Sequence, residues 1–368
     1  MTKDKLFCSV FPYADTQPIV MNAPLSGVFG PELVAAVCEA GGLGVVPAYR
    51  MSPEALGQFC DEVRQRTTRP FAIALDVRES PMTYEGSEEV FSVLKEAGLL
   101  SEFGLPESVE SDADNFFGLV ETTTYQERFE AAIAQRPAAM IALFGGFREP
   151  EEDRLVEEGI LNMAMCTSLK EAKVLRSARA QAIIVQGGDA SGVRFSFEEA
   201  DEPEIGLLTL LPRVVQATGL PVIALGGIYA SEQVAWIRQI GAQGVMLGTA
   251  LLATEESRAD SLHRYFATQG TVGDTVVTRI YEGRKSRVLK NELLARLSPW
   301  ESRIEALDEH GVMWGNLVRR FSQEGKTTYL PRPIGLGLGT SQEGRCAEVI
   351  YCLLYTSPSP RDRQKSRM

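Results

Sequence analysis

The chain has 368 residues, a formal net charge of −12 and a pI of about 4.9. An acidic protein of this kind is not expected to bind nucleic acid or an anionic membrane, because both attract basic surfaces. Hydrophobic residues make up 44% of the chain, which fits one large globular domain with additions, or two smaller domains. No apolar run approaches the length that spans a membrane, and residues 1–12 lack the apolar core of a signal peptide.

The numbers and positions of the cysteines and histidines exclude some types of site. The six cysteines form no Cys-x-x-Cys pair and show no spacing typical of disulfides, so we expect reduced thiols in a cytoplasmic protein. The chain contains two histidines, His263 and His310, which excludes a His-rich metal site and leaves few candidates for a histidine base. We therefore expect no bound metal.

The first half of the chain alternates short apolar strands with amphipathic helices. The first strand ends at Ala23-Pro24, where proline cannot donate a ladder hydrogen bond. Helix signals follow, including Pro31 at a first helical position and Ser52 as an N-cap. The expected strands of this half cover residues 19–24, 44–47, 71–75, 139–144, 161–165 and 182–186.

Residues 78–125 interrupt this rhythm with an acidic stretch of little strand character. We predict an insertion at the rim between the third and fourth strands, with one helix near Val90–Ala97. It could form a lid or be a solvated excursion, and the sequence leaves both possibilities open.

The stretch Leu220–Thr249 organises the rest of the chain. It reads as strand, Gly226-Gly227 turn, helix, strand and Gly248-Thr249 turn. Two parallel strands ending in glycine turns place exposed backbone N–H groups side by side, and such groups commonly bind phosphate. The alternative is a plain βαβ unit whose glycines only make turns.

Eight buried strands alternating with helices over residues 19–250 predict an α/β fold of the (β/α)8 TIM-barrel type, formed by residues 1–254. A doubly wound open sheet is the alternative. We expect residues 255–345 to form a mostly helical extension that packs on the barrel, with an extended piece at 275–280. A basic loop at 283–287 is either solvated or a clamp for an anionic ligand. Residues 346–368 are expected to be a disordered, non-native tail, because the composition shifts to Ser, Pro and Arg from Tyr355.

The predicted carboxyl ends of the strands are rich in glycine, amides and small polar residues. This composition suits a large phosphorylated cofactor whose own atoms do the chemistry, and disfavours a metal hydrolase, a two-carboxylate glycosidase or a Ser-His-Asp triad. Cys166 lies at one strand end, but a small buried apolar role explains it better than reactivity.

Several segments together resemble the nitronate monooxygenase family, formerly called 2-nitropropane dioxygenases. They are PIVMNAP at 18–24, EAGGLG at 39–44, VQGGDASG at 185–192, PVIALGGI at 221–228, GAQGVMLGTALLATEES at 241–257 and the element from Tyr281-Glu282-Gly283-Arg284 through Lys290-Asn291. The resemblance covers residues 17–295. It implies an FMN-dependent barrel that oxidises alkyl nitronates, or similar small anions, with O2. The implied FMN contacts are Ala23, Pro24, Leu25, Gln186, Gly187, Ser191, Gly192, Gly226, Gly227, Met246, Leu247, Gly248 and Thr249.

The chain departs from the family pattern Gln-Gly-x-(Glu/Asp)-Ala-Gly-Gly-His at an important place. Val193 stands where the resemblance implies the catalytic histidine, and Ala74 stands where many members have a flavin-contacting asparagine. Because valine cannot accept a proton, no catalytic residue is assigned, and Asp189 is a weak candidate for a replacement base. A structural hydrogen-bonding role is the alternative for Asp189.

Three functions remain open. The first is an FMN-dependent, nitronate monooxygenase-like oxidase that is poor on neutral nitroalkanes. The second is an FMN-dependent, NAD(P)H-using enoyl-thioester reductase, and the third is a flavin-binding protein with little catalysis. The sequence does not give the oligomeric state.

Overall fold

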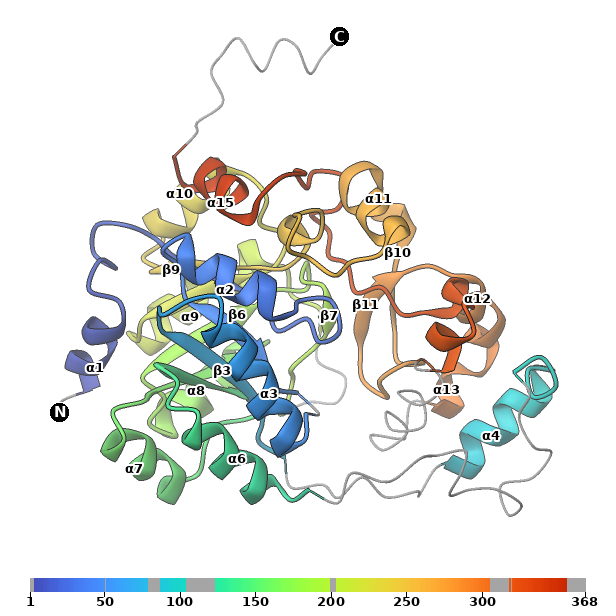
Figure 1. The fold of residues 1–368 in the computed structure, drawn as a ribbon, viewed down its shortest axis with the longest axis horizontal. Coiled ribbons are helices and arrows are strands. Elements are labelled where there is room, and N and C mark those ends of the chain that lie inside the picture. The colour runs from blue at the N-terminus through green and yellow to red at the C-terminus, as the bar shows by residue number, and fades with distance from the viewer. Residues whose placement is uncertain are drawn as a thin grey trace, which may run out of the picture.

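The computed structural model describes residues 3–49, 51–78, 87–103, 123–198, 203–304, 318 and 320–355. Its centre is a sheet of eight parallel strands in the order β1-β9-β8-β6-β5-β4-β3-β2 (Figure 1). The strands are β1 (Ile19–Asn22), β2 (Gly44–Pro47), β3 (Phe71–Asp76), β4 (Ala139–Leu143), β5 (Leu161–Cys166), β6 (Ala182–Gln186), β8 (Val222–Leu225) and β9 (Gly244–Leu247). Every residue of these strands is buried, as expected for strands covered on both faces.

The two edge strands, β1 and β2, meet and close the sheet into a barrel. Met21 and Leu43 form a parallel bridge between them. The Asn22 side chain adds two hydrogen bonds, because its Nδ2 donates to the Val45 carbonyl at 2.9 Å and its Oδ1 accepts from the Val45 N–H at 2.8 Å. The (β/α)8 prediction is therefore confirmed, and the open-sheet alternative is wrong.

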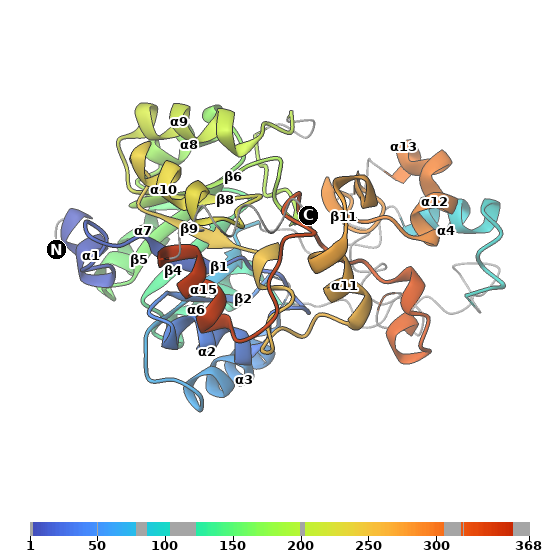
Figure 2. The ribbon, with the colours of Figure 1, turned by 90° about the horizontal axis from the view of Figure 1, so that it is seen from above.

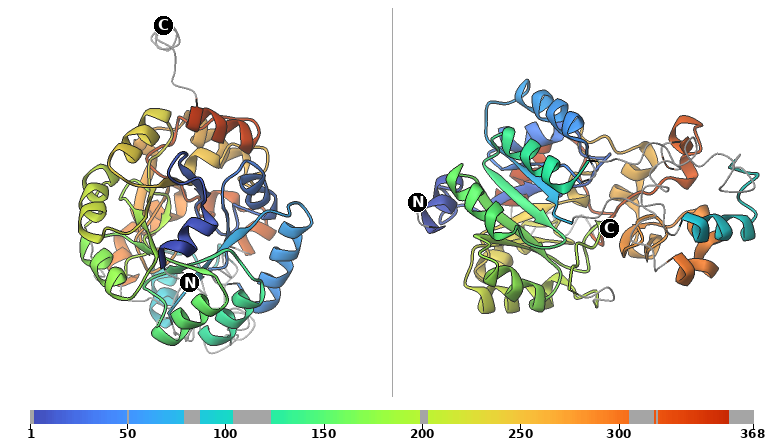
Figure 3. Two further views of the ribbon diagram at one scale, coloured as in Figure 1. Left: turned by 90° about the vertical axis from the view of Figure 1, so that its left-hand side faces the viewer. Right: turned by 90° about the horizontal axis from the view of Figure 1, so that it is seen from below.

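Helices surround the barrel and cover its outer face (Figure 3). Their sequence signals are visible at the N-caps, where the side chains of Ser52, Thr124 and Ser168 accept hydrogen bonds from the first turn. These helices are α2 (Pro31–Glu39), α3 (Pro53–Arg64), α6 (Tyr125–Ala134), α7 (Glu149–Glu157), α8 (Leu169–Ser177), α9 (Leu207–Thr218) and α10 (Ser231–Gln239).

The first helix, α1 (Lys3–Val10), lies across the end of the barrel opposite the glycine turns (Figure 3). Leu6, Phe7 and Phe11 are buried in the main core. The N-terminal residues therefore cover this end of the barrel, and among the described residues the glycine turns lie at the opposite end.

A second, smaller hydrophobic core lies beside the barrel mouth and joins distant parts of the chain (Figure 2). It packs residues of the predicted insertion, among them Phe91, Leu94 and Phe103, against Leu297 and Phe321. α4 (Ser87–Glu96) therefore contacts α13 (Glu301–Ile304) near α12 (Glu292–Leu297), and is not part of a solvated excursion. Residues 79–86 and 104–122 of the expected insertion lie outside the described residues.

The C-terminal extension contains more strand than expected. β10 (Thr275–Thr278) and β11 (Ser286–Leu289) form an antiparallel sheet with β7 (Gly192–Val193), which follows barrel strand β6. The prediction of a mostly helical extension missed this sheet, although the extended piece at 275–280 corresponds to β10. The remaining pieces here are α11 (Ser261–Gln269) and the short 3-10 turns at Thr249–Leu251, Val272–Asp274, Ser298–Trp300 and Thr327–Tyr329.

The expectation of a disordered tail from residue 346 is wrong for its first ten residues. These form α15 (Cys346–Tyr355), which packs against α2 and α10. Val349, Ile350 and Leu353 bury one face of this helix in the main core. Residues 356–368 lie outside the described residues. None of the helices in the described ranges combines the length and apolar character needed to cross a lipid bilayer.

Candidate functional site

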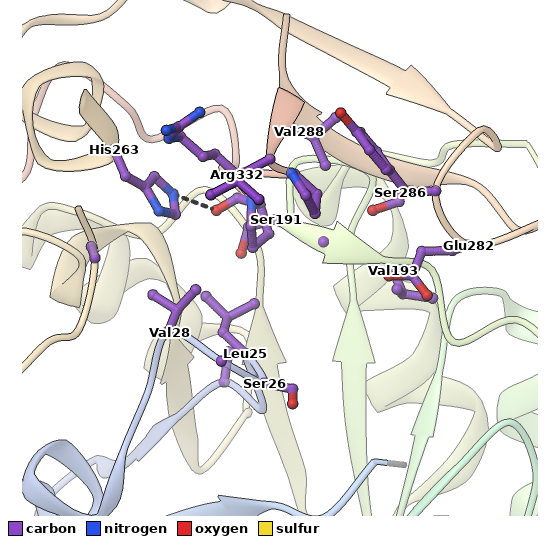
Figure 4. A pocket seen from close by; sticks show the side chains of 18 of the residues that line it. Leu25, Ser26, Val28, Ser191, Val193, His263, Glu282, Ser286, Val288 and Arg332 are labelled. Atoms are coloured by element: carbon purple, nitrogen blue, oxygen red, sulfur yellow. Dashed lines mark hydrogen bonds between the residues drawn. The ribbon is translucent and has the colours of Figure 1, made fainter. Parts of the chain in front are cut away.

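A cavity of about 540 Å³ lies between the barrel mouth and the C-terminal extension. Its barrel side is formed by residues that follow the strands, including the Ala23-Pro24-Leu25 turn after β1 and Gln186 at the end of β6. Its other side comes from the extension, including Ser286 and Val288 on β11 (Figure 4). Both the position at the carboxyl ends of the strands and the apolar lining suit a small-molecule site.

A narrow cleft adjoins this cavity at the ends of β8 and β9. It is lined by Gly226, Gly227, Met246, Gly248 and Thr249, and it shares Ser191 and Leu225 with the larger cavity. Gly227 has φ +63°, which favours glycine, and within the described ranges the N–H groups of Gly227 and Ile228 have no protein acceptor. The cleft therefore presents free main-chain donors, the arrangement that binds phosphate.

Gly248 lies close to two other parts of the site. A Cβ added there would lie 2.8 Å from Ser191 Oγ and 3.6 Å from the Cβ of Ala23. The turn after β9, the turn after β1 and the segment around Ser191 thus meet at a single point. The sequence placed these residues in one site, and the structure brings them together.

The Gln186 side chain positions the backbone of β7. Its Nε2 donates to the Val193 carbonyl at 2.8 Å, and its Oε1 accepts from the Phe195 N–H at 2.9 Å. These bonds hold Gly192 and Val193 in the cavity wall, where the Val193 side chain is only partly buried. Gln186 therefore links the end of β6 to the position that departs from the family pattern.

Two of the expected cofactor residues line neither cavity. Gly187 lies against α9, where an added Cβ would come within 2.6 Å of the Leu207 Cβ. Leu247 is a barrel residue that is 1% exposed. Both shape the site through the backbone.

Asp189 has the structural role that was its alternative. Its Oδ2 accepts the N–H of Leu207 at 2.7 Å, at the first residue of α9, and its main-chain carbonyl accepts from Leu336 at 2.9 Å. The carboxylate caps this helix and does not line the main cavity. This geometry supports the structural role for Asp189.

An aromatic wall borders the cavity at the ends of β2 and β4. Tyr49 and Phe195 line the cavity, and Phe144 lies behind them with ring centroids 5.8 and 5.1 Å away. The guanidinium groups of Arg78 and Arg284 lie 3.9 and 5.0 Å from the centroid of the Phe144 ring.

The basic loop at 283–287 is used within the protein. Arg284 Nη1 donates to the Ser196 carbonyl at 3.1 Å, and Arg287 pairs with Glu204 at 2.9 Å. Both arginines therefore make contacts within the protein and are only partly exposed, so the loop is not simply solvated, and its role as a clamp for an anionic ligand stays a prediction.

A charged cluster forms the far end of the cavity. Arg332 pairs with Asp260 at 2.8 Å, and Asp260 accepts the N–H of His263 at 2.8 Å as the N-cap of α11. The ring Nε2 of His263 lies 2.9 Å from the Pro333 carbonyl. Burial lowers the pKa of His263 to about 4, so the ring is neutral near pH 7 and its Nε2–H donates to this carbonyl.

The segment 331–341 crosses the glycine cleft and was missed by the sequence analysis. The Gly335 N–H donates to Thr249 Oγ1 at 2.8 Å, and Ser341 Oγ donates to the Thr249 carbonyl at 2.8 Å. An added Cβ at Gly335 would lie 2.6 Å from the Asp189 carbonyl oxygen. The alternating glycines of Gly335-Leu336-Gly337-Leu338-Gly339 are the signal that could have indicated this close approach.

With this geometry established, comparison with known proteins identifies the family. A sequence model of nitronate monooxygenase matches residues 10–345, almost the whole chain. The chain belongs to the nitronate monooxygenase family. It is therefore an oxidoreductase of the FMN-dependent class, as the resemblance implied.

Relatives and solved structures agree with this family. A probable nitronate monooxygenase from Staphylococcus saprophyticus is 30% identical over 289 residues, covering 77% of this chain and 79% of that protein. The nitroalkane oxidase from Streptomyces ansochromogenes has a TM-score of 0.80 and 28% identity, covering 96% of this chain and 98% of that chain. FabK from Thermotoga maritima has a TM-score of 0.66 and 20% identity, covering 98% of this chain and 97% of that chain, and it supports the fold alone.

The structure gives Cys166 a buried, unreactive environment. Cys166 is fully buried at the end of β5, and burial raises the pKa of its thiol well above the ordinary range. A protonated, inaccessible thiol has little reactivity, so the apolar role expected from the sequence fits this nitronate monooxygenase family member.

Proposed function

We propose that this protein binds FMN and oxidises alkyl nitronates with O2, and that it acts better on preformed nitronates than on neutral nitroalkanes. The observation that carries this proposal is the glycine cleft with free main-chain donors, directly beside a cavity whose wall has valine at residue 193. We also place the protein in the cytoplasm, because all six cysteines are free thiols.

The chemistry of the site suits an FMN group through its donor groups, although the glycine cleft itself encloses only about 10 Å³. The N–H groups of Gly227 and Ile228, together with the side chain of Ser191, would hold the phosphate in the cleft. The Ala23-Pro24-Leu25 turn would support the ring in the main cavity. When bound, the flavin supplies the redox chemistry by accepting electrons from the substrate and passing them to O2.

The preference for nitronates follows from proton chemistry. A neutral nitroalkane must lose its α-proton before oxidation, and the isopropyl group of Val193 cannot accept it. A nitronate has already lost that proton and requires only binding close to the flavin. Valine at residue 193 therefore lowers the rate of nitroalkane oxidation, because proton removal is slow, while the oxidation of a nitronate remains possible.

The proposal is tested with the purified protein in two steps. The first measures whether it carries, or takes up, one FMN, from its visible absorbance and released flavin. The second mixes the flavin-loaded protein anaerobically with ethylnitronate or with NADPH and follows loss of the yellow absorbance. We expect rapid bleaching by ethylnitronate. A colourless protein that takes up no FMN would refute the cofactor assignment, bleaching by NADPH alone would indicate a reductase, and bleaching by neither would indicate a flavin-binding protein.

A further inference from the structure

Of the described residues that line the cavity, three carry a carboxylate or an imidazole group: Asp260, His263 and Glu282. Asp260 is bound to the Arg332 guanidinium, which lowers the pKa of its carboxyl group together with the His263 backbone N–H. His263 Nε2 is bonded to the Pro333 carbonyl, and burial lowers its pKa to about 4. These two residues form the structural cluster that joins α11 to the segment 331–333.

Glu282 belongs to a different part of the cavity. It lies in the turn between β10 and β11, which is fixed by hydrogen bonds from the N–H groups of Glu282 and Gly283 to the Arg279 carbonyl at 3.3 and 2.8 Å. This turn leads directly into β11, whose residue Ser286 pairs with Val193. The Arg194 N–H also donates to the Lys285 carbonyl at 2.8 Å.

The turn therefore sits against the strand that carries Val193. Figure 4 shows the Glu282 side chain at the same end of the cavity as Val193 and Ser286, away from His263. Glu282, from the connection between β10 and β11, thus lines the same end of the cavity as the residue at which the family pattern has a histidine. The two positions share a wall, although they are 89 residues apart in the sequence (282 − 193).

We propose that Glu282 is the proton acceptor for neutral nitroalkanes in this protein. In the step, the α-carbon–hydrogen bond of the nitroalkane breaks and the proton moves to a Glu282 carboxylate oxygen, which becomes a carboxylic acid. The electron pair of that bond forms the carbon–nitrogen double bond of the nitronate, and the negative charge moves to the nitro oxygens. No oxidant or reductant is consumed, and the product is the anion on which the proposed function acts.

The inference rests on the proposed function and agrees with its substrate preference. Glu282 reaches the cavity from the β10–β11 turn and not from β7, so it need not be aligned with the substrate as the family histidine is, and this step is slower. The negative charge of Glu282 also makes the cavity less favourable for a nitronate that arrives from solution. Removal of that charge therefore affects the two substrates differently.

The experiment compares the flavin-loaded wild type with Glu282→Gln, which keeps the shape of the side chain. General-base catalysis contributes a factor of about 10² to 10⁴, so we expect kcat/KM for neutral nitroethane to fall about a hundredfold. We expect kcat/KM for ethylnitronate to stay within about threefold of the wild-type value, or to rise. Glu54→Gln, on the exposed first turn of α3, is the matched control and should leave both values unchanged.

A second measurement is independent of flavin turnover. Exchange of the α-hydrogens of nitroethane with deuterated water, followed by NMR, reports proton removal alone and can be measured with and without FMN. We expect the wild type to accelerate exchange, Glu282→Gln to lose this acceleration, and the double variant Val193→His, Glu282→Gln to regain it. The proposal is overturned if the wild type produces no exchange above background, or if Glu282→Gln leaves it intact or lowers both kcat/KM values equally. Failure of the wild type to oxidise ethylnitronate would instead overturn the proposed function.

Discussion

The buried imidazole of His263 makes a quantitative prediction about stability and pH. The ring is 2% exposed, and loss of hydration lowers its pKa from 6.5 to about 4, although the Pro333 carbonyl and Asp260 act in the opposite direction. As the pH falls below 6.5, the unfolded chain binds a proton at this residue and the folded protein does not. The free energy of unfolding therefore decreases until the pH falls below the folded pKa.

The size of this effect follows from the two pKa values. Between pH 7 and pH 5 the single site lowers the free energy of unfolding by about 2 kcal/mol. The neighbouring Asp260 does not contribute in this window, because its pKa is lowered from 3.8 and its titration lies at more acidic pH. The positive charges of Arg264 and Arg332, which also face the ring, act in the same direction as burial and lower the pKa of His263.

The assay is urea unfolding of the wild type and His263→Gln at pH 7 and pH 5, with equal m-values as the test of a common transition. Glutamine can still donate an N–H to the Pro333 carbonyl but does not titrate. We expect the wild type to lose about 2 kcal/mol more than the variant over this range. The chain has two histidines, so NMR titration can follow His263 directly. Equal losses in both proteins, or a His263 signal that titrates near pH 6.5, would refute the reasoning.

Three further predictions concern the cleft, the C-terminal helix and the substrate preference. Gly227→Ala should weaken FMN binding about tenfold or more, measured by titration with FMN. The control is Gly219→Ala, where φ is a similar +62° but the surrounding space is open; it should cost about 1 kcal/mol of stability and leave FMN binding unchanged. Ile350→Ala, at a position 2% exposed, should lower the free energy of unfolding by about 2 to 5 kcal/mol, against less than about 0.5 for the exposed Tyr351→Ala; equal effects would mean that α15 does not pack as described. Val193→His should raise kcat/KM for neutral nitroethane by a factor at least about ten times larger than the factor for ethylnitronate. An equal change in the two values would contradict the role given to this position.

The barrel could be predicted from the sequence because its signals are local. Each strand is a short apolar run between turn residues, and the repeat of strand and helix along the chain fixes a parallel sheet. The same reasoning placed Gly226, Gly227, Gly248 and Thr249 in one site, because parallel strands end at the same edge. The assignment of these residues to FMN stays a prediction.

The parts that the sequence did not reveal depend on contacts between distant residues. The pairing of Val193 with Ser286 joins the two-residue strand β7 to the later hairpin of β10 and β11. The residue pattern within these strands does not predict that they pair. Phe91 and Phe103 belong to an acidic stretch, so their burial against Phe321 could not be anticipated from local composition. The predicted start of the disordered tail, residue 346, was too early. The Ser-, Pro- and Arg-rich residues that follow α15 obscured the helix, although Val349 and Ile350 lie on one apolar face of it.

The site divides its tasks between elements with different constraints. The cleft glycines are constrained by the backbone, as at Gly227, where φ is +63° and an added Cβ would lie 3.0 Å from the Asp189 Cβ. Position 193 is different, because Gln186 and β11 hold it through backbone atoms, and its side chain faces the cavity. A residue there can change from imidazole to isopropyl without altering the bonds that place the strand. The β10–β11 turn that carries Glu282 lies beside the wall that contains Val193. In our proposal, this turn supplies the proton acceptor without changing the glycine cleft that would bind the cofactor. The chemistry of this barrel can therefore change at residues 193 and 282 independently of its fold, which is why Val193→His should alter substrate preference without a comparable loss of stability.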